Sequence, residues 1–440
     1  MHPDAAPDRF FDVGSTAVNR LSAEHVERQA ITFLALRDIA HQRRDRVPGS
    51  ILSALDAVVQ SSGRICGLLF GLPHIRQWCL TLREFLVFNL GAEGVQERLD
   101  THAAELRRLL FSSKIAAHRD DGLYETLVVH PNGSLHLPGT GQMLVYGPDC
   151  AGRDVRVGFH DGLLEGGDIL INAIGAAELW TTDMLVRRSG SRVYAFPNED
   201  QQEIQRWRQL VEEYTGELAA HWAAFHREIP FLLKGIIAVE TPSGETHLSG
   251  TFSEVPGAIY LSWADSREVI KEAITHELFH TRLNLLIDHH NFDRTLHEAE
   301  MFWAPWRFQV RPCIPFVHGV YAHFGMMLHN HFVSRHCSYS NWRSKLATHL
   351  IRLAVAEAQW STTAAHLGVP SLLLDVTARV FEVARQVFNE NLPDLTDEFF
   401  VAIAGERGEI RRHGVRLSIP ERVESVERYL KQLSGTLVPQ

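Results

Sequence analysis

Two histidines and a glutamate form the pattern with the most chemical potential in this chain, His276-Glu277-Leu278-Phe279-His280. Residues four apart lie on one face of a helix, so both imidazoles can bind one metal ion, with the glutamate beside them. The motif fixes only three positions and also occurs by chance in ordinary helices. The surrounding elements therefore decide what it means.

The residues around the motif predict a helix that buries the face carrying both histidines. Asp265 and Glu268 have the spacing of a capping box at its start. A stripe at steps of four and three then follows one face: Val269, Ala273, His276, His280, Leu283 and Ile287. Because a buried imidazole without a partner is unfavourable, we favour a metal site over two unrelated histidines.

A catalytic metal needs a third protein ligand, and two candidates follow the motif. Glu300 lies twenty residues after His280. That is the spacing of a glutamate-liganded zinc peptidase, in which Glu277 would act as general base toward a metal-bound water. His318 is the other candidate. The strand expected before the motif, 258–261, fits a peptidase as an edge that pairs with substrate backbone, and a plain core strand explains it equally well.

Composition and charge exclude some function classes. The chain of 440 residues has 43 basic and 53 acidic residues, a net charge of -10, which argues against a nucleic-acid-binding surface. We find no apolar signal segment and no run of about 20 apolar residues that would span a bilayer. The 5 cysteines show no Cys-x-x-Cys pair, so they indicate neither a disulfide framework nor a thiolate zinc site. We expect a cytoplasmic protein with no membrane partner.

The texture of the chain changes twice and predicts three regions. Residues 1–120 have helical apolar periodicity, and residues 121–197 have short β-like runs separated by glycine and proline turns. Residues 198–440 contain a connecting helix, two strands, the motif helix and further helices, so we expect this region to bear the metal. The predicted fold is α+β, mostly helical, with a small antiparallel β unit and the HExxH helix in the C-terminal half.

The segment from Val255 to Phe324 resembles the HExxH-motif peptide-modification proteins, whose wider context is ribosomally made peptide natural products. The blocks that carry the resemblance occur in order: Pro256-Gly257-Ala258-Ile259-Tyr260-Leu261-Ser262, His276 to Asp288, Ala304-Pro305-Trp306-Arg307, Arg311-Pro312 and His318-Gly319-Val320-Tyr321-Ala322. The resemblance implies an iron(II) and α-ketoglutarate-dependent hydroxylase acting at the β-carbon of a peptide residue, with aspartate as the expected residue and a precursor peptide as the partner.

This chemistry gives the motif residues specific roles. An oxygen-activating iron needs a small facial set of protein ligands and open positions for α-ketoglutarate and dioxygen. His276, His280 and His318 would form that set, and Glu300 in place of His318 would look more like the usual facial triad. Glu277 would orient a ligand or a water from outside the ligand set, without acting as a hydrolytic base.

The far carboxylate of α-ketoglutarate needs a cation, best supplied by the bidentate fork of an arginine. Arg307 and Arg311 are the candidates, and ordinary ion pairing explains them almost as well. A nearby aromatic run could line the pocket, although core packing explains at least two of its members: Phe302, Trp303, Trp306 and Phe308. Two other functions stay open, namely a zinc peptidase and a non-catalytic peptide-binding partner.

Overall fold

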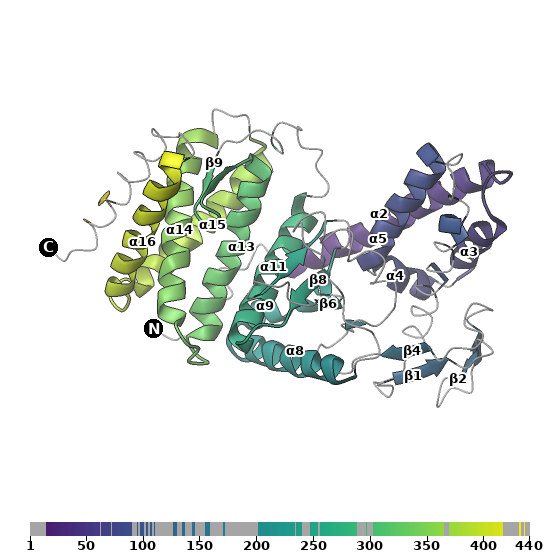
Figure 1. Cartoon of the computed structure of the whole chain (residues 1–440), viewed down its shortest axis with the longest axis horizontal. Coiled ribbons are helices and arrows are strands. Elements are labelled where there is room, and N and C mark those ends of the chain that lie inside the picture. The colour runs from purple at the N-terminus through teal and green to yellow at the C-terminus, as the bar shows by residue number, and fades with distance from the viewer. Residues whose placement is uncertain are drawn as a thin grey trace. The chain divides into compact units, whose positions relative to one another are not determined.

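The computed structural model describes most of the helices and short strands of the chain. The described residues are 15–61, 63–71, 73–89, 95, 97–100, 103, 106–107, 110, 126–129, 134–136, 143–145, 155–158, 170–171, 201–233, 235–239, 247–253, 256–287, 296, 302–364, 369–416, 431–432 and 435. Helices dominate and the strands are short, which confirms the expected α+β fold (Figure 1).

Contacts divide the chain into two compact units. Of the described residues, one unit comprises those in 217–223 and from 271 onward, and the other comprises those from 15 to 216 and in 224–270. We call them the C-terminal and N-terminal units and describe each by itself. The three regions expected from the sequence are a different division, and they remain a prediction.

The N-terminal unit begins with a cluster of helices around an apolar core. Its helical elements are α2 (Ser15–Gln42), α3 (Gly49–Val59), α4 (Gly63–Gly71), α5 (Pro73–Glu84) and the π-helix η2 (Phe85–Asn89). α2 packs against the three α-helices that follow it. Phe33 and Trp78 are fully buried at the centre, with their ring centroids 5.9 Å apart. This helical region agrees with the apolar periodicity of the sequence.

Short antiparallel ladders follow, as the β-like runs of the sequence predicted. They are β1 (Thr126–Val129) with β4 (Val155–Gly158), and β2 (Ser134–His136) with β3 (Met143–Val145). The connecting helix expected after them is present as α8 (Gln201–His221), followed by the short helices α9 (Ala223–His226) and α10 (Ile229–Leu232).

A four-stranded mixed sheet precedes the motif helix. Its order is β5-β6-β8-β7, with strands β5 (Leu170–Ile171), β6 (Gly235–Val239), β7 (Ser249–Thr251) and β8 (Ala258–Ser262). β8 pairs in parallel with β6 and antiparallel with β7, and all five of its residues are buried. The prediction that residues 258–261 form a free edge for substrate is therefore wrong, because both hydrogen-bonding sides of this strand are occupied. The alternative of a plain core strand holds.

The C-terminal unit contains most of the motif helix and a group of long helices. Its elements are α11 (Arg267–Ile287) from residue 271 onward, β9 (Phe302–Ala304), β10 (Gln309–Arg311), α13 (Cys313–His329), the π-helix η4 (Asn330–Ser334), α14 (Trp342–Thr363), α15 (Ser371–Asn391) and α16 (Thr396–Arg416). α13, α14 and α15 all contact one another, and α16 packs on α14, so these helices lie side by side in Figure 1.

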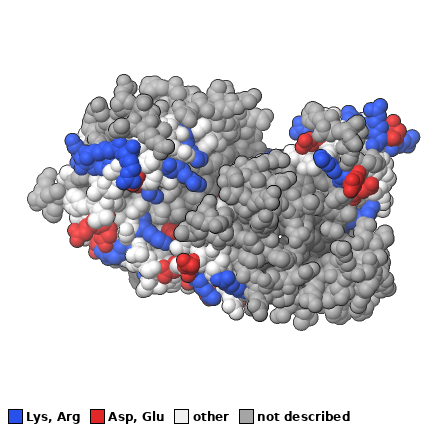
Figure 2. Space-filling view, viewed as in Figure 1, with Lys and Arg blue, Asp and Glu red and all other residues white. Residues whose placement is uncertain are grey.

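Charge and hydropathy of the described residues add two observations. On the face drawn in Figure 2, acidic and basic side chains are interspersed among uncharged ones. None of the described helices has the length and apolar composition needed to cross a bilayer.

Candidate metal centre

The motif helix α11 buries a stripe next to the histidines rather than the histidine face itself. Ile270, Ile274 and Leu278, at steps of four, are fully buried, whereas Val269 is 38% exposed. His276 and His280 are half-buried. The predicted stripe was therefore wrong by about one position, and the two histidines border the core of the helix face.

The two motif imidazoles face each other across one helical turn. His276 Nε2 and His280 Nε2 lie 3.1 Å apart, and the ring centroids are 4.6 Å apart. With metal–nitrogen bonds of about 2.1 Å, two ligands at a right angle have nitrogens about 3.0 Å apart. The pair thus has the separation of two ligands on one ion.

His276 favours its neutral form. Burial, followed by the positive charges of Arg307 and His349, lowers the pKa of His276 to about 4, against an opposing effect of Glu272. A neutral imidazole has a lone pair to donate to a metal. The residue is therefore in its ligand form near neutral pH.

His318 reaches the pair from α13. Its Nδ1 lies 3.3 Å from His280 Nδ1, and the ring centroids are 5.4 Å apart. α13 approaches α11 closely at Gly325, where a Cβ would collide with Phe279 of α11, and it approaches the turn between β9 and β10 at Gly319, where a Cβ would collide with the indole of Trp306. The structure thus brings all three predicted metal ligands into one cluster.

The two arginines lie on the β9–β10 hairpin. Arg307 is exposed in the turn, where its backbone N–H donates to Ala304 O at 3.1 Å, and Phe308 closes the turn with a left-handed φ of 50°. The Arg307 guanidinium makes no hydrogen bond or ion pair with any residue that the structure describes. Arg311 is half-buried, and burial and then the charge of Arg307 lower the pKa of Arg311. Two cations in such proximity favour an anion between or beside them.

The aromatic run divides into core and site residues. Phe302 stacks on Phe316 at 4.7 Å, and Trp303 is 2% exposed, so these two are core residues. Trp306 stacks instead on His323, with ring centroids 5.0 Å apart and planes 27° apart. Phe308 stacks on His413 at 5.4 Å. Trp306 is thus the member of the run that touches the histidine cluster.

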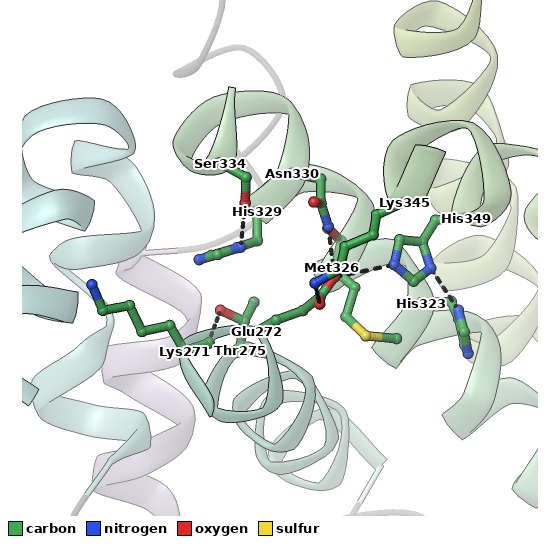
Figure 3. A network of polar contacts seen from close by, with 10 residues as sticks. All are labelled: Lys271, Glu272, Thr275, His323, Met326, His329, Asn330, Ser334, Lys345 and His349. Atoms are coloured by element: carbon green, nitrogen blue, oxygen red, sulfur yellow. Dashed lines mark hydrogen bonds and ion pairs between the residues drawn. The ribbon is translucent and has the colours of Figure 1, made fainter. Parts of the chain in front are cut away.

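A buried polar network adjoins the histidines, and we did not predict it from the sequence (Figure 3). Glu272 Oε1 lies 3.3 Å from His349 Nε2, and His349 Nδ1 lies 3.0 Å from His323 Nδ1. Lys345 Nζ donates to Glu272 Oε2 at 2.6 Å, and Asn330 Nδ2 donates to Glu272 Oε1 at 2.7 Å. One sequence signal was available, since Glu272 precedes His276 by one helical turn.

The network fixes the charge state of its carboxylate. Burial alone would raise the pKa of Glu272, but the hydrogen bond with His349 and the charges of His349 and Lys345 together lower it. Burial lowers the pKa of His323 well below its ordinary value, and the charges of His349 and His276 act in the same direction. An ionised carboxylate thus lies two hydrogen bonds from a neutral histidine.

The imidazole nitrogens of the cluster are suitable ligands for a metal such as iron(II) or zinc. Their positions, however, do not form a complete set of three ligands around one point. Within the part of the chain that the structure describes, no three His, Cys, Asp or Glu side chains surround one point at ligand distance. The cause lies in His280, which turns opposite ring nitrogens to His276 and His318. The pair is arranged for an ion, and a third ligand has to approach it.

Two further site residues were predicted from the sequence, Glu277 and Glu300. Glu277 is 3% exposed on α11, beside the pair. The alternative ligand Glu300 lies outside the described residues.

No family model matches this chain, and no curated protein matches it in a sequence comparison.

Proposed function

We propose that this protein is an iron(II) and α-ketoglutarate-dependent hydroxylase that acts at the β-carbon of a residue, with aspartate expected, in a ribosomally made precursor peptide. The class of substrate comes from the resemblance in segment 255–324. We further propose a cytoplasmic location, as expected from the sequence.

The observation that carries the proposal is a two-histidine metal pair with an uncommitted cation next to it. His276 Nε2 and His280 Nε2 lie 3.1 Å apart, and the charge of Arg307 acts on His276. A hydrolytic zinc site needs only water as a further ligand, whereas an α-ketoglutarate site also needs a cation for the far carboxylate. Arg307 meets that additional need.

In this proposal the residues divide the work. His276 and His280 hold the metal through Nε2, and a histidine of α13 completes the protein ligand set. Arg307, with Arg311 beside it, binds the far carboxylate of α-ketoglutarate through charge-assisted hydrogen bonds. Glu277 orients a ligand or a water from its buried position on α11. Bound iron(II) supplies the oxidising chemistry: α-ketoglutarate, dioxygen and the peptide C–H group become succinate, carbon dioxide and the peptide alcohol.

The zinc peptidase has less support. Its expected substrate edge at residues 258–261 is paired on both sides, so it cannot receive a peptide backbone by strand addition. We therefore place the hydroxylase ahead of the peptidase.

Succinate release tests the proposal directly. The full chain, loaded anaerobically with Fe(II), is mixed with α-ketoglutarate and a candidate precursor peptide, and then exposed to dioxygen. We expect succinate and a peptide heavier by one oxygen atom in equal amounts, both lost with zinc in place of iron. Cleavage of the peptide by the zinc-loaded protein, without any need for α-ketoglutarate, would contradict the proposal and favour the peptidase.

Matched histidine variants give the control. His280→Ala removes a motif imidazole, and His41→Ala removes a histidine that pairs with Asp56 in the N-terminal unit. We expect His280→Ala to abolish Fe(II) binding and succinate release and His41→Ala to retain both. A protein that binds no metal in either form would instead be the non-catalytic peptide-binding partner.

A further inference from the structure

The two ring nitrogens of His280 face different residues: Nε2 faces the other motif histidine, and Nδ1 faces a histidine of α13. Nε2 faces His276 Nε2 at 3.1 Å, so it lies on the side where the ion would bind. Nδ1 faces His318 Nδ1 at 3.3 Å, on the other side of the ring. A metal-bound histidine commonly donates its second N–H to an outer partner that fixes its tautomer and orientation. His318 occupies that outer position.

His323, five residues later on α13, approaches the pair from a different direction. Its ring centroid lies 6.2 Å from that of His276, with the rings nearly perpendicular at 86°. The side chain is 5% exposed, and its Nδ1 is at hydrogen-bond distance, 3.0 Å, from His349 Nδ1. No residue that the structure describes hydrogen-bonds to its Nε2. His323 is thus anchored through one nitrogen and has the other available.

The hydrogen-bond chain selects the tautomer of His323 that a metal needs. Glu272 can only accept, so His349 donates from Nε2 to that carboxylate; when the His349 ring is neutral, its other nitrogen is an acceptor. Nδ1 of His349 then accepts, which requires His323 to donate from its own Nδ1. The remaining nitrogen of His323, Nε2, therefore carries the lone pair.

Further contacts hold this chain in place. Lys345 and Asn330 both donate to Glu272, at 2.6 and 2.7 Å. Trp306 stacks on the face of His323 and packs against the backbone at Gly319. Figure 3 shows His349 between the carboxylate and His323, so the three side chains form one line from α11 through α14 to α13. The carboxylate therefore acts on His323 through one intermediate histidine, His349, as a longer form of the outer support that metal-bound histidines commonly have.

We infer that His323, oriented by His349 and Glu272, is the third protein ligand of the metal, and that His318 is a positioning residue acting through His280. The inference rests on the proposed metal centre. Because no three described side chains yet surround one point, metal binding has to draw the His323 ring toward His276.

Cobalt(II) as a substitute ion distinguishes the two histidines. Each imidazole bound to paramagnetic Co(II) gives a strongly shifted, exchangeable N–H proton resonance. We expect three such resonances in the full-length wild-type chain and in His318→Ala, and two in His323→Ala and His323→Gln. Loss of a resonance in His318→Ala, with all three kept in both His323 variants, would overturn the inference.

Metal affinity supplies a second readout with a conservative rescue. We expect His323→Ala to weaken Co(II) binding more than 100-fold. His318→Ala should weaken it by about 10–100-fold, as loss of an outer partner does, with partial recovery in His318→Gln. Equal weakening in His318→Ala and His318→Gln, beyond that of His323→Ala, would contradict the assignment. Urea unfolding of each metal-free variant identifies any that fails to fold, and the second His323 variant then replaces it.

The outcomes separate this inference from the proposed function. Three Co(II)-shifted resonances including that of His323, without succinate release by the iron-loaded protein, would refute the hydroxylase and leave the ligand assignment standing. Succinate release, with a Co(II)-shifted resonance from His318 in place of one from His323, would support the hydroxylase and refute the ligand assignment.

Discussion

The two units each contain a carboxylate held by a histidine and a basic side chain, and the pair invites comparison. In the N-terminal helices, Asp56 Oδ1 lies 2.8 Å from Arg37 Nε and 3.0 Å from His41 Nε2. In the C-terminal helices, Glu272 makes the equivalent contacts with Lys345 and His349 at 2.6 and 3.3 Å.

Burial is what distinguishes the two clusters. The Asp56 and His41 side chains are 33% and 36% exposed, whereas those of Glu272 and His349 are 13% and 9% exposed. A half-exposed ion pair costs little to desolvate and contributes little. A buried pair carries a desolvation cost that its own attraction barely offsets. The buried cluster is therefore not explained by stability alone, and in the proposed function its contact with His323 would orient a metal ligand.

Removal of each carboxylate should give the largest difference in stability between the two clusters. Glu272→Ala leaves Lys345 and His349 without their buried partner and should lower the free energy of unfolding by about 3 kcal/mol or more. Asp56→Ala should lower it by no more than about 1 kcal/mol. Urea unfolding of the metal-free protein measures both. Equal effects would mean that burial does not separate the clusters.

The arginines of the two regions should differ in ligand binding. Arg37 already pairs with Asp56, whereas Arg307 pairs with no described residue. Loss of a hydrogen bond to a charged group costs about 1.5–3 kcal/mol, so Arg307→Ala should weaken α-ketoglutarate binding by about 10–100-fold. Arg37→Ala should leave that affinity unchanged.

Isothermal titration of α-ketoglutarate into the metal-loaded protein gives both affinities. Arg307→Lys keeps the charge but loses the bidentate fork, so its affinity for α-ketoglutarate should fall between those of Arg307→Ala and Arg37→Ala. An unchanged affinity in Arg307→Ala would contradict the role of Arg307 and leave Arg311 as the candidate for binding the far carboxylate.

Two helical glycines should respond in opposite directions to alanine. A Cβ at Gly319 collides with Trp306, so Gly319→Ala should lower the free energy of unfolding by about 1–3 kcal/mol. Gly67 in α4 has nothing within 4 Å of the added Cβ, so Gly67→Ala should raise it by about 0.5–1 kcal/mol. Thermal unfolding compares them. Stabilisation by Gly319→Ala would show that Trp306 does not pack tightly there.

The smallest expected effect is the pH dependence of the exposed cluster. Burial alone would raise the pKa of Asp56, but hydrogen bonds from Arg37 and His41 lower it overall. Its stabilisation is therefore present above about pH 4, where the unfolded carboxyl is ionised, and is lost as pH falls through the folded pKa. The difference in unfolding free energy between wild type and Asp56→Asn, about 1 kcal/mol or less, should vanish as the pH falls below the folded pKa. A difference that grows on acidification would contradict this sign.

Local patterns in the sequence predicted elements better than they predicted pairing. Residues 258–261 read correctly as a strand, because the run of apolar and β-branched residues is a local signal. Its place in the sheet was undetermined, because β6 and β7 pair with it from elsewhere in the chain. The helical stripe of α11 was wrong by about one position, since several assignments of the buried face fit the same residues.

The sequence by itself determined the motif helix and the pairing of His276 with His280, since a spacing of four residues fixes both on one side of a helix. It also indicated the α+β class and a segment rich in arginine and aromatic residues after the motif, but not the β9–β10 hairpin that this segment forms. Only the tertiary structure decided which nitrogen of His280 faces His318, and that Glu272, His349 and His323 form one line. Those three come from different helices, and no local pattern fixes the packing that brings α11, α13 and α14 together.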